Sequence, residues 1–492
     1  MAKLIATIIC VLGIWQLFRL NREREVQTSK ALWIPTLWLF IGSSRGVGQW
    51  LGIYGGGDPN LDGSPLDRAV LSAVLAIGVI VLVGRGRRVG MLLRSNIPIL
   101  LYFLYCGTSI LWSDFPDVAF KRWFRALGDV VMILIVLSDP NWLAAVRRLF
   151  ARLGFLLLPL SILFIRYYPA LGRFYTRAGD TTWSGVTTDK NALGMISLIF
   201  GLAALFRFLE IRGGKERALK RGQLIAQATL IGVALYLLVD SNSATAFSCF
   251  LLGGGVMVLT KLMRVARRPA VLHLLVLTAV IVPLSAMFIG LGSGLVGDLG
   301  RNSTFTGRTA IWHAALDLAE NPLIGTGYES FWLGPRVQKF ASQVGYGLNQ
   351  AHNGYIEVYL NIGWVGLIFL ATLLVTGYRR VIAAARLQTP IGSLRLAFFV
   401  VTIVYNFSEA GFKMMHPVWI VFLLSIAAVP EVTSQESPEL KARIDDWRSV
   451  AEKPATLSVS VRQNRDVRLP RPLWKSSSRA ESLPAAWGGS AA

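Results

Sequence analysis

The sequence predicts an all-α, polytopic integral membrane protein. Its 492 residues are 53% hydrophobic and only 16% charged, with a mean hydropathy of +0.52. Soluble domains of this size carry roughly a quarter charged residues. A helix that crosses the ~30 Å hydrocarbon core needs about 20 mostly apolar residues, whereas a barrel strand needs about 10 alternating ones. The chain has thirteen apolar runs of helical rather than strand length, so we predict 12–13 transmembrane helices.

The predicted helices are interrupted once, by a long polar segment at residues 291–353. The second run and the last two runs are short, and one short run could be a re-entrant or interfacial piece. This is why 12 and 13 helices are both compatible with the sequence. The runs cover residues 4–18, 31–44, 69–84, 96–112, 123–138, 153–168, 191–209, 222–239, 244–260, 270–290, 355–377, 396–409 and 417–430.

The net charge of +22 is explained by membrane topology. In a soluble protein this charge would suggest nucleic acid, but here Lys and Arg gather in every second loop. Cytoplasmic loops collect Lys and Arg, so we assign these loops to the cytoplasm and predict no nucleic-acid partner. The amino terminus and the loop 291–353 then lie outside. The basic loops are residues 19–30, 85–94, 147–152, 212–221, 261–268 and 379–395.

Residues 431–492 differ from the rest of the chain because they mix Pro, Ser and scattered charge without a sustained apolar period. Such a composition buries too little apolar surface to fold independently. We therefore predict a transmembrane domain over residues 1–430, followed by a cytoplasmic, mostly disordered tail with at most a short helix near residues 440–450.

No metal site is predicted. The three cysteines, Cys10, Cys106 and Cys249, lie in apolar runs without pairing or ligand spacing. The four histidines show no paired metal-ligand spacing, and no carboxylate cluster accompanies them. We expect the cysteines to be small buried hydrophobic residues.

His352 is the strongest candidate for chemistry. It stands with Asn353 and Gly354 where the long outer loop meets the next apolar run. An imidazole can accept a proton from a hydroxyl near neutral pH, which few side chains can do unaided. The other three histidines are expected to be structural.

Cations on the outer side point to an anionic ligand. Lys121, Arg122 and Arg125 have a spacing that predicts one helical face at the start of the fifth run. Arg308 precedes a predicted amphipathic helix at residues 309–318, which Asn321-Pro322 would end and which would lie on the membrane. Any one of these cations could contact lipid headgroups or cap a helix, but arginine also suits phosphate because its planar fork donates two parallel hydrogen bonds.

Four outer motifs resemble one family. In the first motif, nine residues separate the pair His352-Asn353 from Gly363, and two residues separate Gly363 from Gly366. The other motifs are residues 185–194 (GVTTDKNALG), 241–246 (SNSATA) and 306–332 (TGRTAIW…NPLIGTGYESFW). Together they resemble the bacterial O-antigen ligases and the related O-antigen and exopolysaccharide polymerases, over roughly residues 110–430.

The resemblance implies a glycosyltransferase on the periplasmic face of the bacterial inner membrane. Its donor would be a sugar chain on undecaprenyl pyrophosphate and its acceptor a sugar hydroxyl of a glycan or of lipid A-core. Direct displacement would invert the anomeric carbon without a metal or cofactor. The implied catalytic residues are His352, as general base or orienting group, and Arg308. The implied substrate-binding residues are Lys121, Arg122, Arg125, Arg166, Arg177, Lys190, Asn191, Asn353 and Tyr328.

One departure bears on the branch of the family. Many ligases have a Ser-Arg pair near the SNSATA turn, whereas Ser243 is followed here by Ala244. The loss of one phosphate-binding candidate favours the succinoglycan-type exopolysaccharide polymerases over the lipid A-core ligases.

Two other classes compete with this hypothesis. A transporter or lipid flippase would be expected to show repeated halves and midplane charge. The runs show no such halves and are nearly free of midplane charge, with Asp129, and Glu357 and Glu409 near helix ends, as the exceptions. A non-catalytic scaffold for a polysaccharide export complex, itself a candidate partner, would explain the basic tail. It would not explain the grouping of His352, Arg308 and the outer cations.

Overall fold

A computed structural model describes residues 1–23, 26–53, 63–175, 179, 181–214, 220–262, 268–289, 305–387 and 389–430. The predicted tail and part of the long loop lie outside these residues, so the domain division remains a prediction. In the described part, the helical prediction is confirmed, and each of the thirteen apolar runs falls on a helix. One two-stranded hairpin, β1 (Arg173–Tyr175) with β2 (Thr181–Trp183), is the exception to an all-α fold.

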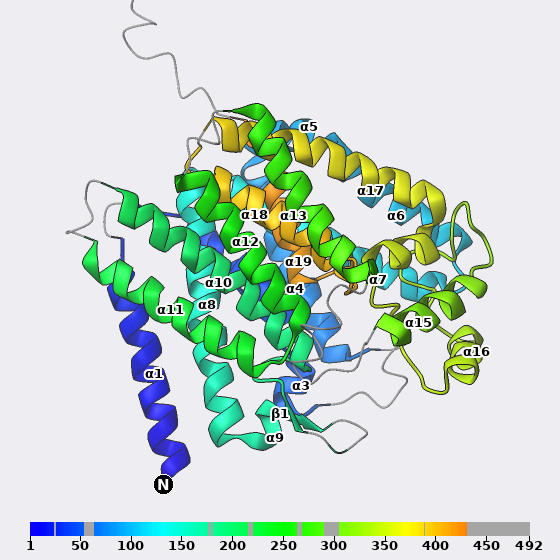
Figure 1. Ribbon diagram of the computed structural model, residues 1–492, viewed down its shortest axis with the longest axis horizontal. Coiled ribbons are helices and arrows are strands. Elements are labelled where there is room, and N and C mark those ends of the chain that lie inside the picture. The colour runs from blue at the N-terminus through cyan, green and yellow to red at the C-terminus, as the bar shows by residue number, and fades with distance from the viewer. Residues whose placement is uncertain are drawn as a thin grey trace, which may run out of the picture. The chain divides into compact units, whose positions relative to one another are not determined.

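The helices of the first half run from α1 to α9 (Figure 1). They are α1 (Ala2–Leu20), α2 (Trp33–Gly42), α3 (Val47–Leu51), α4 (Pro65–Val83), α5 (Gly86–Ser95), α6 (Ile97–Thr108), α7 (Pro116–Leu137), α8 (Trp142–Tyr167) and α9 (Pro169–Gly172), with 3-10 turns η1 (Lys30–Leu32) and η2 (Ser109–Trp112).

The second half contains the long central helices and the outer elements. They are α10 (Lys190–Gly213), α11 (Arg221–Asp240), α12 (Ala244–Leu262), α13 (Pro269–Ile289), α15 (Phe305–Asp317), α16 (Pro335–Val344), α17 (Gly354–Arg386), α18 (Gly392–Tyr405) and α19 (Pro417–Ile426).

Seven described helices are long and apolar enough to cross a membrane, and the pair of α5 with α6–η2, bent by 85°, could be an eighth span. Four shorter apolar segments lie at residues 30–42, 270–285, 392–405 and 417–426. Helix α7 has spanning length as well, at 22 residues, but carries several charges. The chain is therefore a polytopic α-helical membrane protein, and the total of 12–13 crossings remains a prediction.

Helix α10 forms the centre of the bundle. It packs against α8, α11 and α12, and 72% of its apolar window is buried in the protein. A helix that is apolar on all sides is either surrounded by protein or faces lipid, and α10 is surrounded by protein. Helix α1 is the opposite case, because it contacts only α8 and α11 closely and leaves most of its side chains exposed (Figure 1).

A small second core builds the outer cap of the bundle. Helices α15 and α16 pack on each other, and α15 contacts α17, at one edge of the structure (Figure 1). The predicted helix at 309–318 is confirmed as α15, which ends before Asn321-Pro322. Arg336 ties the cap to the bundle through Asp114 at 2.8 Å and pairs with Glu320 of the cap at 3.1 Å. The buried residues of this core are Ile311, Ala315, Phe331, Trp332, Phe340, Ala351 and Leu360.

Helix α17 is kinked at Ile362–Gly363, and the segment at residues 322–325 packs against this kink. Gly363 has a φ of +65°, which strongly favours glycine. A Cβ at this position would meet the carbonyl oxygen of Leu323 at 2.2 Å. At Gly366, a Cβ would meet Ile362 Cγ1 at 2.3 Å. Gly363 therefore lets the cap segment at residues 322–325 lie against the kink, and Gly366 leaves room for the Ile362 side chain.

Replacing Gly363 by Ala should destabilise the protein. A side chain at this positive φ costs about 1–3 kcal/mol, and the clash with the Leu323 carbonyl adds to that cost. The thermal unfolding midpoint of the purified protein in detergent should fall accordingly. Gly232→Ala in α11 is the control, since a Cβ added there would have no neighbour within 4 Å. Equal midpoints for the two variants would contradict the role of the kink.

Candidate active site

The candidate site is built around one buried carboxylate, Glu409, in the loop between α18 and α19. Its side chain is 8% exposed and has partners from three distant segments. Oε2 lies 3.3 Å from His352 Nδ1. Oε1 accepts from Arg308 at 3.1 Å and from Asn191 Nδ2 at 3.3 Å. These contacts bring together the loop before α17, the start of α15 and the start of α10.

The backbone of His352 is held in a conformation unusual for a residue with a side chain. Its φ is +51°. The next residues fix this turn, because Gly354 N donates to the carbonyls of Asn406 at 2.8 Å and Glu409 at 3.1 Å. A Cβ on Gly354 would lie 2.0 Å from Asn406 Oδ1. The His-Asn-Gly sequence is therefore packed directly onto the loop that carries Glu409.

The peptide of Ala351, just before His352, is held on both sides. Its N–H donates to the Glu357 carboxylate, and its carbonyl accepts from Trp312 Nε1 at 3.0 Å. Trp332 Nε1 donates to the same Glu357 carboxylate at 2.9 Å. The outer cap thus fixes the position of the histidine through the peptide that precedes it.

Asn191 reaches the site because α10 begins in the right place. The Asp189 side chain accepts from Asn191 N at 2.9 Å and Ala192 N at 3.0 Å and so forms the helix cap. Gly194 lets α10 approach the SNSATA turn, since a Cβ there would lie 2.8 Å from Ser243 Cβ. From that turn, Thr245 bonds Ser408 at 2.9 Å, next to Glu409.

The arrangement can move a proton. A carboxylate at Nδ1 favours the tautomer with the hydrogen on Nδ1, which leaves Nε2 of His352 as a proton acceptor. The same carboxylate stabilises the imidazolium that forms when Nε2 takes a proton. Arg308 shares Glu409 and keeps 24% of its side chain exposed, so it lies beside the histidine as a positive charge.

Two comparisons with known proteins found sequences that resemble this chain. Residues 228–371 match the family model described as O-antigen ligase. The chain is also 30% identical over 306 residues to the exopolysaccharide production protein ExoQ of Rhizobium meliloti (strain 1021), and the match spans 58% of this chain and 65% of that relative.

The chain is thus similar to the O-antigen ligase family and to ExoQ, and it spans just under two thirds of the length of that relative. The region matched by the O-antigen ligase model contains His352 and Arg308 but neither Asn191 nor Glu409. Two of the four residues that meet in the site therefore come from outside it.

Other residues implied by the family motifs lie beside the site or support it. Lys190 is the first residue of α10, next to Asn191. Asn353 caps α17, because its side chain accepts from Tyr355 N at 3.0 Å and Ile356 N at 3.1 Å. Its geometry is that of a structural residue that orients the turn after His352. Tyr328 lies in the core at 6% exposure, with its pKa raised by burial.

Lys121, Arg122 and Arg125, which are predicted to share one face of α7, meet different neighbours. Arg122 donates to the carbonyl of Glu329, in the cap segment. Lys121 and Arg125 instead line a pocket between α4 and α7. At ~100° per residue the three side chains leave α7 within an arc of about 100°, with Arg122 at one edge of that arc.

Two further predicted residues are not brought to Glu409 by described contacts. Arg166 bonds the Tyr236 hydroxyl and lies 3.9 Å from Asp240, at the edge formed by α8 and α11. Arg177 lies outside the described residues, so its placement cannot be compared with the prediction.

Glu409 is the site residue that the sequence analysis missed. It was noted only as a charge at the end of an apolar run, and no carboxylate was assigned to the histidine. The signal was present, because an ionisable residue in such a run is expected to have a partner and a function. The described residues contain no group of three or more His, Cys, Asp or Glu side chains that could hold a metal ion.

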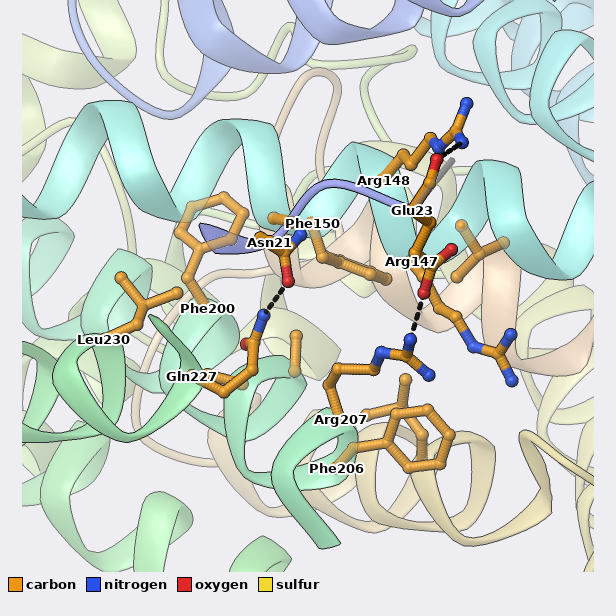
Figure 2. Close-up of a pocket in the computed structure, with 15 residues that line it drawn as sticks. Asn21, Glu23, Arg147, Arg148, Phe150, Phe200, Phe206, Arg207, Gln227 and Leu230 are labelled. Atoms are coloured by element: carbon orange, nitrogen blue, oxygen red, sulfur yellow. Dashed lines mark hydrogen bonds and ion pairs between the residues drawn. The ribbon is translucent and has the colours of Figure 1, made fainter. Parts of the chain in front are cut away.

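A polar pocket lies near the end of α10 that is opposite Asn191. The charged side chains that line this pocket pair with one another. Figure 2 shows Glu23 directed at Arg207, and Gln227 at Asn21. Arg207 also pairs with Glu210 at 2.8 Å. These groups join the segment after α1 to α10 and α11, so we interpret the pocket as a structural crosslink.

His416, at the other end of the Glu409 loop, is half-buried and makes the stability depend on pH. Burial, aided by Lys413, lowers its pKa to about 3. Its Nδ1 is buried with no hydrogen-bond partner among the described residues. The unfolded histidine titrates near ~6.5, so the unfolded state gains a proton that the folded state lacks as the pH falls below that value.

Substituting His416→Phe should therefore flatten the acid side of the stability profile. The wild type should lose up to ~1.4 kcal/mol per pH unit through this residue as the pH falls from ~6.5. Thermal unfolding in detergent between about pH 7 and pH 5 measures this slope. His313→Phe, at an exposed histidine of α15, is the control. A wild-type slope in the His416 variant would contradict the assignment.

Proposed function

We propose that the protein is a periplasmic-face glycosyltransferase that transfers undecaprenyl-pyrophosphate-linked oligosaccharide onto a sugar hydroxyl. The observation that carries this proposal is the convergence of His352 and Arg308 on the buried Glu409 carboxylate. A base and a cation side by side are what this transfer requires, since it deprotonates a hydroxyl and releases a pyrophosphate.

The proposed step is a single displacement. The acceptor hydroxyl oxygen forms a bond to the anomeric carbon of the donor as the bond from that carbon to the pyrophosphate oxygen breaks. The hydroxyl proton goes to His352 Nε2, and Glu409 stabilises the resulting imidazolium. Attack opposite the leaving group inverts the anomeric carbon.

Arg308 is proposed to meet the charge that develops on the leaving pyrophosphate. In the free protein its guanidinium bonds Glu409, and the remaining donors of its fork can bind phosphate oxygens. The guanidinium can therefore bridge Glu409 and the donor, which would place the leaving group near the base. This step uses no metal, because a fixed cation supplies the electrostatic stabilisation.

We favour polymerisation of exopolysaccharide or O-antigen over ligation to lipid A-core. The similarity to ExoQ supports this choice, as does Ala244, which stands where many ligases have an arginine. The proposal places the protein in the bacterial inner membrane with a cytoplasmic carboxyl terminus, where alternate basic loops support the orientation. Ligase activity is the second candidate, supported by the match to the O-antigen ligase model.

Glu409→Gln should reduce the rate of glycan transfer by roughly 10²–10⁴-fold while the protein still inserts. The amide keeps the size of the side chain but removes the charge that supports the imidazolium and attracts Arg308. Initial rates with a purified lipid-linked donor measure the effect. Asp117→Asn is the matched control at an exposed carboxylate of α7, and a similar loss in both variants would contradict the role of Glu409.

The proposed function itself is tested in cells that carry His352→Ala or Arg308→Ala at normal protein levels. Polysaccharide resolved by size should show accumulated single lipid-linked repeat units and no long polymer. Long polymer retained on the lipid carrier, with none on lipid A-core, would identify a ligase instead. Unchanged polysaccharide in both variants would overturn the proposed site and favour transport.

A further inference from the structure

A second basic site lies between α4 and α7, in a cavity of ≈ 220 Å³. One wall is basic, with Arg68 from α4 and Lys121 and Arg125 from α7. The rest of the lining is Trp38, Leu71, Ser72, Leu75, Phe120 and Phe124, which is almost entirely apolar. A basic wall on an apolar chamber matches a ligand with a phosphate at one end and hydrocarbon at the other.

The two α7 cations in this cavity are not neutralised by the described part of the protein. The charges that act most strongly on Arg125 are attractive from Asp67 alone and repulsive from Arg122 and Arg68. The Asp67 carboxylate accepts from Gly48 N at 2.9 Å and makes no ion pair with Arg125. Within the described residues, Lys121 and Arg125 have neither an ion pair nor a side-chain hydrogen bond. An anion would satisfy guanidinium and ammonium donors that are otherwise partly shielded from water.

The surface beside the cavity is suited to hydrocarbon chains. Helix α4 is a candidate membrane span, and its apolar residues Leu71 and Leu75 line the cavity. Phe120 and Phe124 of α7, which line the cavity, are 53% and 39% exposed. Exposed apolar side chains on a spanning helix face lipid, so a phosphate held by the basic wall can leave its chains in the bilayer.

We propose that this cavity binds the phosphate headgroup of an anionic phospholipid, separately from the glycosyl-transfer site. Arg122 donates to the Glu329 carbonyl instead of lining the cavity, and so it marks the division between the two regions. The cavity and the catalytic loop nevertheless share Asp129. Its carboxylate accepts from Trp38 Nε1 at 2.8 Å, in the cavity wall, and from Met415 N at 2.7 Å, in the loop of Glu409. A bound lipid would therefore support the loop without taking part in the reaction.

The full-length protein in detergent is tested by native mass spectrometry with phosphatidylglycerol, phosphatidylcholine, inorganic phosphate and undecaprenyl phosphate as separate probes. Phosphatidylglycerol should be retained preferentially. The double substitution Lys121→Gln with Arg125→Gln should weaken its retention by roughly tenfold or more, since each basic residue near a headgroup contributes about fivefold. Ser72→Trp, which fills the cavity and keeps the cations, should weaken it as well.

The matched control removes the same charge elsewhere. Lys339→Gln with Arg379→Gln changes two exposed cations outside the cavity and should leave retention unchanged. Equal retention by the cavity variants and the control would overturn the proposal. Competition by inorganic phosphate would reassign the cavity to a free anion, and preferred binding of undecaprenyl phosphate would make it part of the donor site. Loss of lipid retention with the Glu409-dependent transfer step still measurable would support a separate lipid site.

Discussion

The structure of the outer face depends on the burial of one carboxylate. Glu409 ends an apolar stretch and is 8% exposed, so its charge must be met by the protein. Its partners are His352, Arg308 and Asn191, which lie far apart in the sequence and reach it from different helices. Any arrangement of the bundle that separated these segments would leave a buried charge unpaired. The requirement that stabilises the outer face is thus the same one that brings a base and a cation together.

Close backbone approach is the second constraint, and it explains why the motifs contain glycine. At Gly354, Gly363 and Gly194, an added Cβ would lie within 3 Å of atoms from another segment. These positions pack the His-Asn turn on the Glu409 loop, the kink of α17 on the cap, and α10 on the SNSATA turn. The spacing of the His-Asn motif therefore reflects packing around the site, whereas the chemistry belongs to the histidine.

Much of this architecture could be predicted because a membrane makes apolar run length a strong signal. The helices, including the one in the long loop, followed from local pattern, and motifs selected His352 and Arg308 as candidates. The pairing of Glu409 with His352 could not, since 57 residues separate them in the chain and only the packing of α17 against α18 brings them together. The sequence also could not show that Arg122 contacts Glu329 while Lys121 and Arg125 line a cavity. Helical spacing gives the direction of a side chain but not the neighbour that it meets.

The most direct test of this account is a double-mutant cycle on the transfer rate with His352→Ala, Glu409→Gln and the combined variant. If Glu409 acts through the histidine, its substitution should cost little once the histidine is absent, and the two losses should be strongly non-additive. A coupling of about 2 kcal/mol or more would support the arrangement. Additive losses would show that the two residues act independently and would contradict the central claim.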